Sequence, residues 1–558
     1  CVLIVGFKSY IGGFRDTKYQ TSLSILFHHL LMSDLITGLA RPQIVGTIIC
    51  TVLVAIGSAL FHQVLTRTPL PSNAPKQWTK NDWPIVGAWR FYKRRRDMYL
   101  EAQRSTKTGN FSFYVGKKLI VGLSGSEGKK TFFDNRELSI SQGNADLLTG
   151  VPAPESNEFY QLFTKILTTL LKTTNLVSVL DHFKADSRRA FDSLIAAPCA
   201  RRGQDWGVMN PFDFMQRLIY QLTVRATGAR EVAEDPKLLE STLRMISEFE
   251  GRASHAKIYF PWLPTINYMI QMLNGIKMYM IFDKIIKDRK KSGKTVDDPF
   301  QRLMDDGLSV QDTVAFEIAA LVAGLINSTI HAAYLPIYWA TNSEWKARIK
   351  EEVDGVIAKY RTSEAQSPAD VLDTLSLEQW ETEFKFIDLS LRESIRLGQP
   401  GTAFRKNTTN KNIPIGNTEE VIPPDAYVAY LVDNTGLSED IYLDPLTFNP
   451  RRFEENVTEE MKQPHSYLGW GSGRHICLGM RLAKLEVSMV NAYLVSRFDF
   501  ELSDEHGNSR SEPLAPINRN LHQFNRPAEP VYLRYRSRVF SDHRYNRGPV
   551  VPHVAGDV

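Results

Sequence analysis

A single cysteine, Cys477, stands in a loop whose composition limits what this chain can be. The loop reads Trp470-Gly471-Ser472-Gly473-Arg474-His475-Ile476-Cys477-Leu478-Gly479, and Met480–Glu486 follows it with a helical pattern. Glycines let backbone pass flat beneath a large planar ligand and aim its amides at a sulfur atom. A helix N-terminus and Arg474 supply positive potential, which keeps a thiolate ionised. Such a cysteine can be the axial ligand of a haem iron.

The alternative for Cys477 is a small buried residue after a glycine turn, since free cysteines are usually buried and inert. The other cysteines are Cys1, Cys50 and Cys199, and all four are scattered along the chain. No pair has the spacing of a zinc site, and a disulfide framework is not expected. The pattern is typical of a reducing compartment.

Composition describes an ordinary globular protein with a substantial core. The 558 residues are 43% hydrophobic and 23% charged, and large single catalytic domains reach this length. The net charge of +5 is too small for this length to indicate a nucleic-acid partner.

Residues 42–66 contain no Lys, Arg, Asp or Glu, which predicts a transmembrane anchor. About 20 apolar residues span a bilayer as a helix; a buried core helix is the alternative. Basic residues are denser after this segment than before it, so the C-terminal part should face the cytosol. Residues 67–90 carry prolines and predict an extended hinge. Since the chain begins with Cys1, residues 1–41 are an uncertain N-terminal segment.

The pattern of residues 91–540 predicts one mainly α domain with a minor β-sheet subdomain. Residues 541–558 are expected to form a C-terminal tail. Residues 111–115 and 119–123 alternate around Gly116 as a hairpin would. Further strands are expected at 427–432 and 531–536. Helices are expected at 159–171, 180–197, 210–227, 236–252, 310–339, 345–359 and 375–397.

The cysteine loop resembles that of the cytochrome P450 family. The family has an aromatic residue seven positions before the cysteine, a glycine four before and a glycine two after, here Trp470, Gly473 and Gly479. An arginine commonly stands two before, where this chain has His475, as in fungal members and sterol demethylases. The resemblance implies the P450 fold and haem b on Cys477. The haem would lie against Trp470, Gly471, Gly473, Arg474, His475 and Gly479.

Two further motifs stand in the family's order. Glu393-Ser394-Ile395-Arg396 places an acid and a base on one helix face, which alone would indicate a surface ion pair. Phe448-Asn449-Pro450-Arg451-Arg452-Phe453 resembles the family segment whose arginine joins that pair. The resemblance therefore implies a buried network of Glu393, Arg396 and Arg452 behind the haem.

A third motif, Ala323-Gly324-Leu325-Ile326-Asn327-Ser328, lies in the long apolar helix. It resembles the family's Ala-Gly-x-acid-Thr-Thr/Ser segment, whose small residues, here Ala323 and Gly324, would open the helix where oxygen binds. Ile326 stands at the acid position and Asn327 at the threonine position. An amide holds a water but cannot relay a proton as a hydroxyl does, so Ser328 or Thr329 could substitute. A polar residue satisfied within a packed helix is the alternative.

Arg405 stands where family members often have an arginine that binds a haem propionate. The Trp-x-x-x-Arg motif expected for the other propionate contact is not clear in this chain, and Lys165 and Lys172 are weak candidates.

Together the motifs imply a membrane-anchored haem-thiolate monooxygenase of the endoplasmic reticulum, single-pass, with its catalytic domain in the cytosol. It would use O2 and electrons from NADPH through a separate NADPH–cytochrome P450 reductase, which Arg474, Arg481 and Lys484 could contact. An apolar substrate (terpenoid, steroid or polyketide-like) and a tailoring step in fungal secondary metabolism are expected. Asn327 keeps a reductase-independent isomerase or peroxygenase open, and a non-catalytic haem-binding protein is the remaining alternative.

Overall fold

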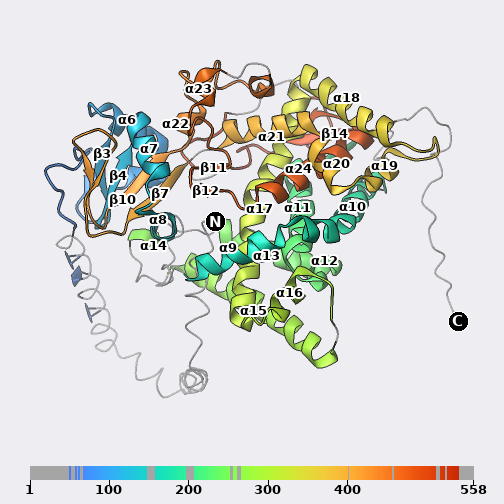
Figure 1. The fold of residues 1–558 in the computed structure, drawn as a ribbon, viewed down its shortest axis with the longest axis horizontal. Coiled ribbons are helices and arrows are strands. Elements are labelled where there is room, and N and C mark those ends of the chain that lie inside the picture. Colours follow the sequence, from blue (N-terminus) through green and yellow to red (C-terminus); the bar gives the residue numbers. More distant parts are fainter. Residues whose placement is uncertain are drawn as a thin grey trace.

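The computed structural model describes residues 67–147, 158–196, 206–251, 256–259, 265–293, 295–399, 401–454, 458–510, 516–521 and 524–538, with scattered positions between 50 and 62. Helices form the larger part, and a sheet built mostly from the N-terminal third lies at one side (Figure 1). This arrangement confirms the prediction of a mainly α chain with minor β structure.

The helices fall into a short N-terminal group, a long central group and a group that precedes and follows the cysteine loop. They are α5 (Arg90–Lys93), α6 (Arg95–Arg104), α7 (Gly125–Asp134), α8 (Ile140–Leu147), α9 (Glu158–Leu170), α10 (Thr173–Ala196), α11 (Pro211–Thr227), α12 (Arg230–Glu234), α13 (Pro236–Gly251), α14 (Ala256–Tyr259), α15 (Ile266–Ser292), α16 (Pro299–Asp305), α17 (Val310–Thr341), α18 (Ser343–Tyr360), α19 (Pro368–Thr374), α20 (Leu377–Thr382), α21 (Lys385–Gly398), α22 (Asp433–Gly436), the 3-10 helix η1 (Pro450–Phe453), α23 (Glu459–Lys462) and α24 (Met480–Arg497).

The largest sheet has the order β1-β2-β3-β4-β10-β7-β5, and its central strands β4 and β10 run parallel. Its strands are β1 (Asp82–Trp83), β2 (Gly87–Ala88), β3 (Phe111–Val115), β4 (Lys118–Leu123), β5 (Leu138–Ser139), β7 (Thr402–Asn407) and β10 (Tyr427–Leu431). A smaller sheet has the order β13 (Phe498–Ser503), β14 (Tyr532–Ser537) and β6 (Gly207–Met209), with β14 in the centre. Two further sheets pair β8 (Ile413–Pro414) with β9 (Val421–Ile422), and β11 (Gly471–Ser472) with β12 (His475–Ile476).

Helix α17 is the centre of the helical part. It packs on α11, α21 and α24, and most of its side chains are buried, including Trp339. Ser309 caps its N-terminus by accepting a hydrogen bond from the backbone N–H of Asp312. Within the part of the chain that the structure describes, α17 is the helix long and apolar enough to cross a membrane. Its burial instead makes it the core helix of this domain.

Most expected elements are present with shifted ends, but the helix expected over 375–397 is two helices, α20 and α21. Phe384, with φ −101° and ψ 56°, leaves the helical conformation between them. Glu352 of α18 accepts hydrogen bonds from the backbone N–H groups of Phe386 and Ile387, so a distant carboxylate caps α21. The long helix α15, absent from the expectations, follows the aromatic segment around Tyr259.

The predicted anchor, residues 42–66, lies mostly outside the described residues. Its described positions between 50 and 62 are helical, and Val54 and Phe61 there are exposed. The segments 1–41 and 541–558 lie outside the described residues altogether.

Candidate functional site

The cysteine loop folds as a tight hairpin that presents Cys477 ahead of a helix. Strands β11 and β12 pair antiparallel, with Gly471 opposite Ile476, and the backbone N–H of Cys477 donates to the carbonyl of Trp470 at 2.7 Å. Gly471 has a φ of 78°, and a Cβ there would lie 2.3 Å from the His475 carbonyl oxygen. Cys477 is exposed, and α24 begins three residues later with Gly479 at its N-cap.

Helix α7 fixes the other side of this hairpin. A Cβ on Gly473 would lie 2.5 Å from the carbonyl oxygen of Phe133, so only glycine permits this approach. His465 places Nδ1 2.6 Å from the Ser472 hydroxyl and Nε2 3.1 Å from an Asp134 carboxylate oxygen. Sequence analysis gave no role to His465 or Asp134, because neither belongs to a recognisable motif.

The structure brings Glu393, Arg396 and Arg452 together in one buried network. Arg396 donates to both carboxylate oxygens of Glu393 at 2.8 Å, and Arg452 donates to one of them at 3.0 Å. The backbone N–H of Asn449 adds a further donor at 3.0 Å. The Glu393 side chain is 0% exposed, so its charge is satisfied entirely within the protein.

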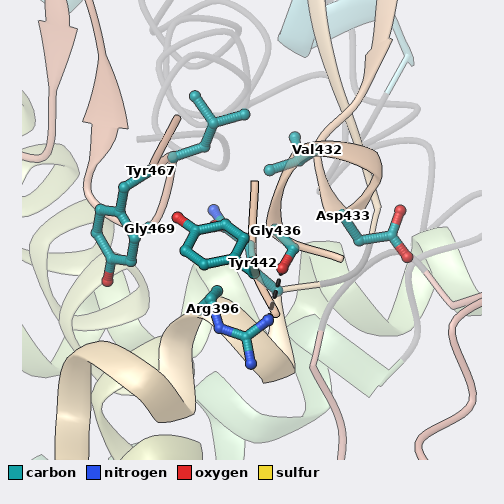
Figure 2. A pocket seen from close by; sticks show the side chains of 9 residues that line it. Arg396, Val432, Asp433, Gly436, Tyr442, Tyr467 and Gly469 are labelled. Atoms are coloured by element: carbon teal, nitrogen blue, oxygen red, sulfur yellow. Dashed lines mark hydrogen bonds between the residues drawn. The ribbon is translucent and has the colours of Figure 1, made fainter. Parts of the chain in front are cut away.

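The two arginines use their remaining N–H groups on backbone carbonyls. Arg396 donates to the carbonyls of Gly436 and Pro445 at 2.6 and 2.7 Å, and Arg452 to that of Leu443 at 2.8 Å. Figure 2 shows the Arg396 guanidinium under the Tyr442 ring, beside a small pocket that reaches Gly469 at the start of the cysteine loop. The network therefore ties α21 to the segment that leads into the loop.

Arg405 is a buried cation with unused hydrogen-bonding capacity. Its side chain is 2% exposed, and Nε and Nη1 have no hydrogen-bond partner among the described residues. Burial lowers the pKa of Arg405 to about 10, and only partial compensation comes from Tyr160 and Asp134. The guanidinium thus stays protonated at neutral pH, and a bound anion would satisfy its free N–H groups and its charge.

Two more groups lie close enough to Arg405 to interact with its charge. Burial, Arg405 and Arg474 lower the pKa of His475 to about 4, so this imidazole is neutral at pH 7. Tyr160 of α9 also feels the Arg405 charge, although burial dominates and raises its pKa. Arg405, His475 and Tyr160 together fit the carboxylate of a haem propionate. Lys165 and Lys172 are exposed, and Tyr160, which sequence analysis missed, lies on the same helix as Lys165.

Helix α17 has one window that is not buried. Ala323 and Ile326 are partly exposed and Asn327 is exposed, whereas the turns on both sides are buried. Ser328 and Thr329 are 7% and 5% exposed, and the Thr329 hydroxyl is buried without a hydrogen-bond partner among the described residues. The amide of Asn327 is therefore the polar side chain that this window presents.

Gly324 serves helix packing in this structure. A Cβ there would lie 2.6 Å from Cγ2 of Thr223 on α11, and α17 continues as an unbroken helix through this position. The Thr223 hydroxyl in turn donates to the carboxyl of Glu486 on α24 at 3.0 Å, and burial raises the pKa of Glu486 to about 8. The glycine thus lets three helices meet at a neutral acid.

The three basic residues expected on the reductase-facing surface are not equally available. Arg481 pairs with Glu381 of α20, and Lys484 pairs with Asp388 of α21 at 2.7 Å. Arg474 is exposed.

Comparison with known proteins agrees with this geometry. The family model described as "Cytochrome P450" matches residues 79–524. Similar proteins include the cytochrome P450 monooxygenase dmxR5 of Cryptosporiopsis sp. (strain 8999), 31% identical over 81% of this chain and 89% of the relative. Another is the monooxygenase AacuE of Aspergillus aculeatus, 30% identical over 79% and 89%. The solved structure of retinoic acid bound cyanobacterial CYP120A1 has a TM-score of 0.64, 18% identity, and covers 84% of this chain and 100% of that one.

A helical fold of this kind, with a cysteine hairpin ahead of α24, defines a haem-thiolate protein. The chain belongs to the cytochrome P450 family, and the two relatives named above are monooxygenases.

The buried network allows a direct test of its energetic role. Replacing Glu393 by glutamine leaves Arg396 and Arg452 buried without a carboxylate, which should lower the free energy of unfolding by about 3–5 kcal/mol. Denaturant unfolding of the haem-loaded protein measures it. The matched control, Glu381→Gln, breaks the more exposed pair with Arg481 and should cost about 0–1 kcal/mol. Equal losses in the two variants would show that the network is no more than a surface pair.

Arg405 should control how long haem stays bound. Arg405→Met removes a charged hydrogen-bond donor worth about 1.5–3 kcal/mol, so haem transfer to apomyoglobin should accelerate about tenfold or more. Lys165→Met, on an exposed side chain of α9, should leave the transfer rate unchanged. A larger effect from Lys165→Met would move the propionate contact to that lysine.

Proposed function

We propose that this protein is a membrane-anchored monooxygenase that hydroxylates or epoxidises an apolar small molecule with O2 and electrons from NADPH. The observation that carries the proposal is the Cys477 hairpin with the unpaired, buried Arg405 nearby. In this proposal, Cys477 would supply a thiolate ligand for the haem iron and Arg405 a cation for a haem carboxylate.

Haem b would be held by the thiolate of Cys477, with Trp470, Gly471, Gly473, Arg474 and Gly479 lining its site. Arg405, with Tyr160 and His475, would take a propionate. Bound there, haem supplies the activation of O2 that inserts one oxygen atom into substrate and reduces the other to water. The ion network of Glu393, Arg396 and Arg452 keeps the hairpin in place behind it.

The proton needed for oxygen activation would be delivered through α17. Asn327 faces the exposed window and can hold a water, whereas a hydroxyl relay would have to use Ser328 or Thr329. Because Ser328 and Thr329 are buried, the geometry favours a water held by Asn327. The partly exposed Ala323 one turn earlier leaves room beside it.

Electrons would come from a separate NADPH–cytochrome P450 reductase, since the chain has no glycine-rich dinucleotide motif. Arg474 is the exposed basic group on the cysteine hairpin that could contact it, while Arg481 and Lys484 would first have to exchange their present partners. The apolar segment 42–66 would hold the enzyme in the endoplasmic reticulum membrane with its catalytic domain in the cytosol.

The substrate would be a terpenoid, steroid or polyketide-like molecule, oxidised in a tailoring step of fungal secondary metabolism. Support comes from the fungal origin of the monooxygenase relatives and from the aromatic contact between Tyr259 of α14 and Tyr92.

A reductase-independent isomerase or peroxygenase is the second candidate, and the residue that favours it is Asn327 in place of a threonine. Turnover that requires NADPH and reductase separates the two, because an isomerase or peroxygenase would act without either.

Cys477 should be the axial ligand. Cys477→Ala should abolish the thiolate-type spectrum of the reduced protein with carbon monoxide, because no other described cysteine is near the hairpin. Cys50→Ala is the matched control and should keep that spectrum. A thiolate-type spectrum in Cys477→Ala would refute the central assignment.

Variants of Asn327, Ser328 and Thr329 in α17 test which of these residues takes part in proton delivery. Asn327→Ala should lower product formed per NADPH by about tenfold or more and raise hydrogen peroxide release, since positioned proton transfer typically contributes 10²–10⁴-fold. Thr329→Val, which removes a buried and unpaired hydroxyl, should turn over normally. If Ser328→Ala uncouples the reaction and Asn327→Ala does not, Ser328 is the relay. No change in any variant would limit this segment to a role in shape.

A further inference from the structure

Arg95, near the start of α6, is a second buried cation without an anion. Its side chain is 0% exposed, and Nη1 and Nη2 have no hydrogen-bond partner among the residues that the structure describes. Nε makes a long hydrogen bond of 3.4 Å to the carbonyl of Phe91, and the described residues place no carboxylate in an ion pair with Arg95. Four N–H bonds of one guanidinium are therefore unused.

Aromatic rings surround this guanidinium. Its central carbon lies 4.9 Å from the ring centroid of Phe91, 5.7 Å from that of Tyr92 and 5.9 Å from that of Phe404. Cation–π contacts recover only part of the cost of burying a charge. Burial lowers the pKa of Arg95 to about 9, which leaves the group protonated at neutral pH. The positive charge remains, and the rings cannot accept its hydrogen bonds.

A haem carboxylate that binds Arg405 cannot also bind Arg95. Phe404 and Arg405 are consecutive in β7, so their side chains point to opposite faces of the sheet. Phe404 packs with Phe91 and Arg95, whereas Arg405 lies over Phe132 of α7 on the other face. Arg95 consequently needs a different anion.

The face that holds Arg95 is covered by two short helices, α8 and α14. Leu147 of α8 and Ile258 of α14 belong to the same apolar cluster as Phe91 and Phe404. The Tyr259 ring of α14 lies 5.6 Å from that of Tyr92 in an edge-to-face contact. Figure 1 shows α14 beside α8 at the edge of the sheet. Among the described residues, the four-residue helix α14 therefore packs against this cluster.

We propose that Arg95 binds a carboxylate carried by the substrate, so that this enzyme takes an aromatic or polycyclic acid rather than a wholly neutral molecule. The inference rests on the proposed monooxygenase function and narrows its substrate class. The terminal nitrogens of a guanidinium match a carboxylate in bidentate geometry, and the rings of Phe91, Tyr92 and Phe404 receive an apolar body. A shift of α14 admits the ligand.

The affinity of matched probes tests this with the full-length holoenzyme. The probes are 2-naphthoate and 2-naphthamide, which share one shape and differ in charge, and calorimetric titration measures both. The wild-type protein should bind 2-naphthoate at least about tenfold more tightly, as expected for a charged hydrogen-bonded pair. Equal affinities in the wild-type protein overturn the proposal without the need for any variant.

Variants assign the preference to this residue. Arg95→Met should reduce 2-naphthoate affinity to that of 2-naphthamide and leave 2-naphthamide unchanged. Arg94→Met alters the exposed neighbour and should keep the full preference. If Arg95→Met does not fold, Arg95→Lys supplies the test, because it keeps the charge but not the planar fork and should retain only part of the preference. An undiminished preference in Arg95→Met or Arg95→Lys overturns the assignment.

Two other outcomes identify competing roles. Binding to phosphatidylcholine vesicles that contain phosphatidate should not change in Arg95→Met; a loss there, with 2-naphthoate binding intact, would assign Arg95 to a lipid headgroup and overturn the substrate assignment. The carbon monoxide spectrum of Arg95→Met should remain that of the wild type. An absent thiolate spectrum in the wild-type protein would defeat the proposed function, whereas the naphthoate preference is read independently of it.

Discussion

The carboxylate of Glu393 is the charge on which the cysteine site depends. It accepts hydrogen bonds from Arg396, Arg452 and the backbone of Asn449, and the two arginines then bind carbonyls between Gly436 and Thr447. One acid and two bases leave one positive charge in excess, which those carbonyl dipoles balance. A loop segment with little regular structure is thereby fixed to α21 at its start and reaches the cysteine hairpin in a defined position.

The rule that a buried charge needs a partner also applies to Arg405 and Arg95, which have no anionic partner among the described residues. Where Glu393 satisfies its arginines inside the protein, Arg405 and Arg95 carry buried charges that the described chain leaves open. A protein retains such a cost where a ligand offsets it, since an unpaired buried charge otherwise only destabilises the fold. The two lie on opposite faces of β7, so one sheet would carry the proposed cofactor contact on one face and the inferred substrate contact on the other.

Sequence patterns predicted the local secondary structure but missed contacts between residues that are far apart in the sequence. The hairpin of β3 and β4 and the long helix α17 follow from hydrophobic periodicity. The ion network of Glu393, Arg396 and Arg452 followed only from the family resemblance, because the spacing alone indicated a surface ion pair. Tyr160 beside Arg405 and His465 between Asp134 and Ser472 did not, because each acts through a residue far away in sequence. The break between α20 and α21 was missed for the same reason, since Glu352 of another helix caps α21. Salt bridges to Arg481 and Lys484 likewise depend on folding.

Helix α17 shows why the identity of residue 327 matters more than the number of hydroxyl groups near it. The helix must be buried to pack on α11, α21 and α24, and it opens only around Ala323 and Asn327. At 3.6 residues per turn, positions 328 and 329 are turned progressively away from position 327. Their hydroxyls lie in the packed interior, where that of Thr329 has no hydrogen-bond partner among the described residues. A side chain that serves a reaction in this window must therefore hold position 327 or act through a water bound there.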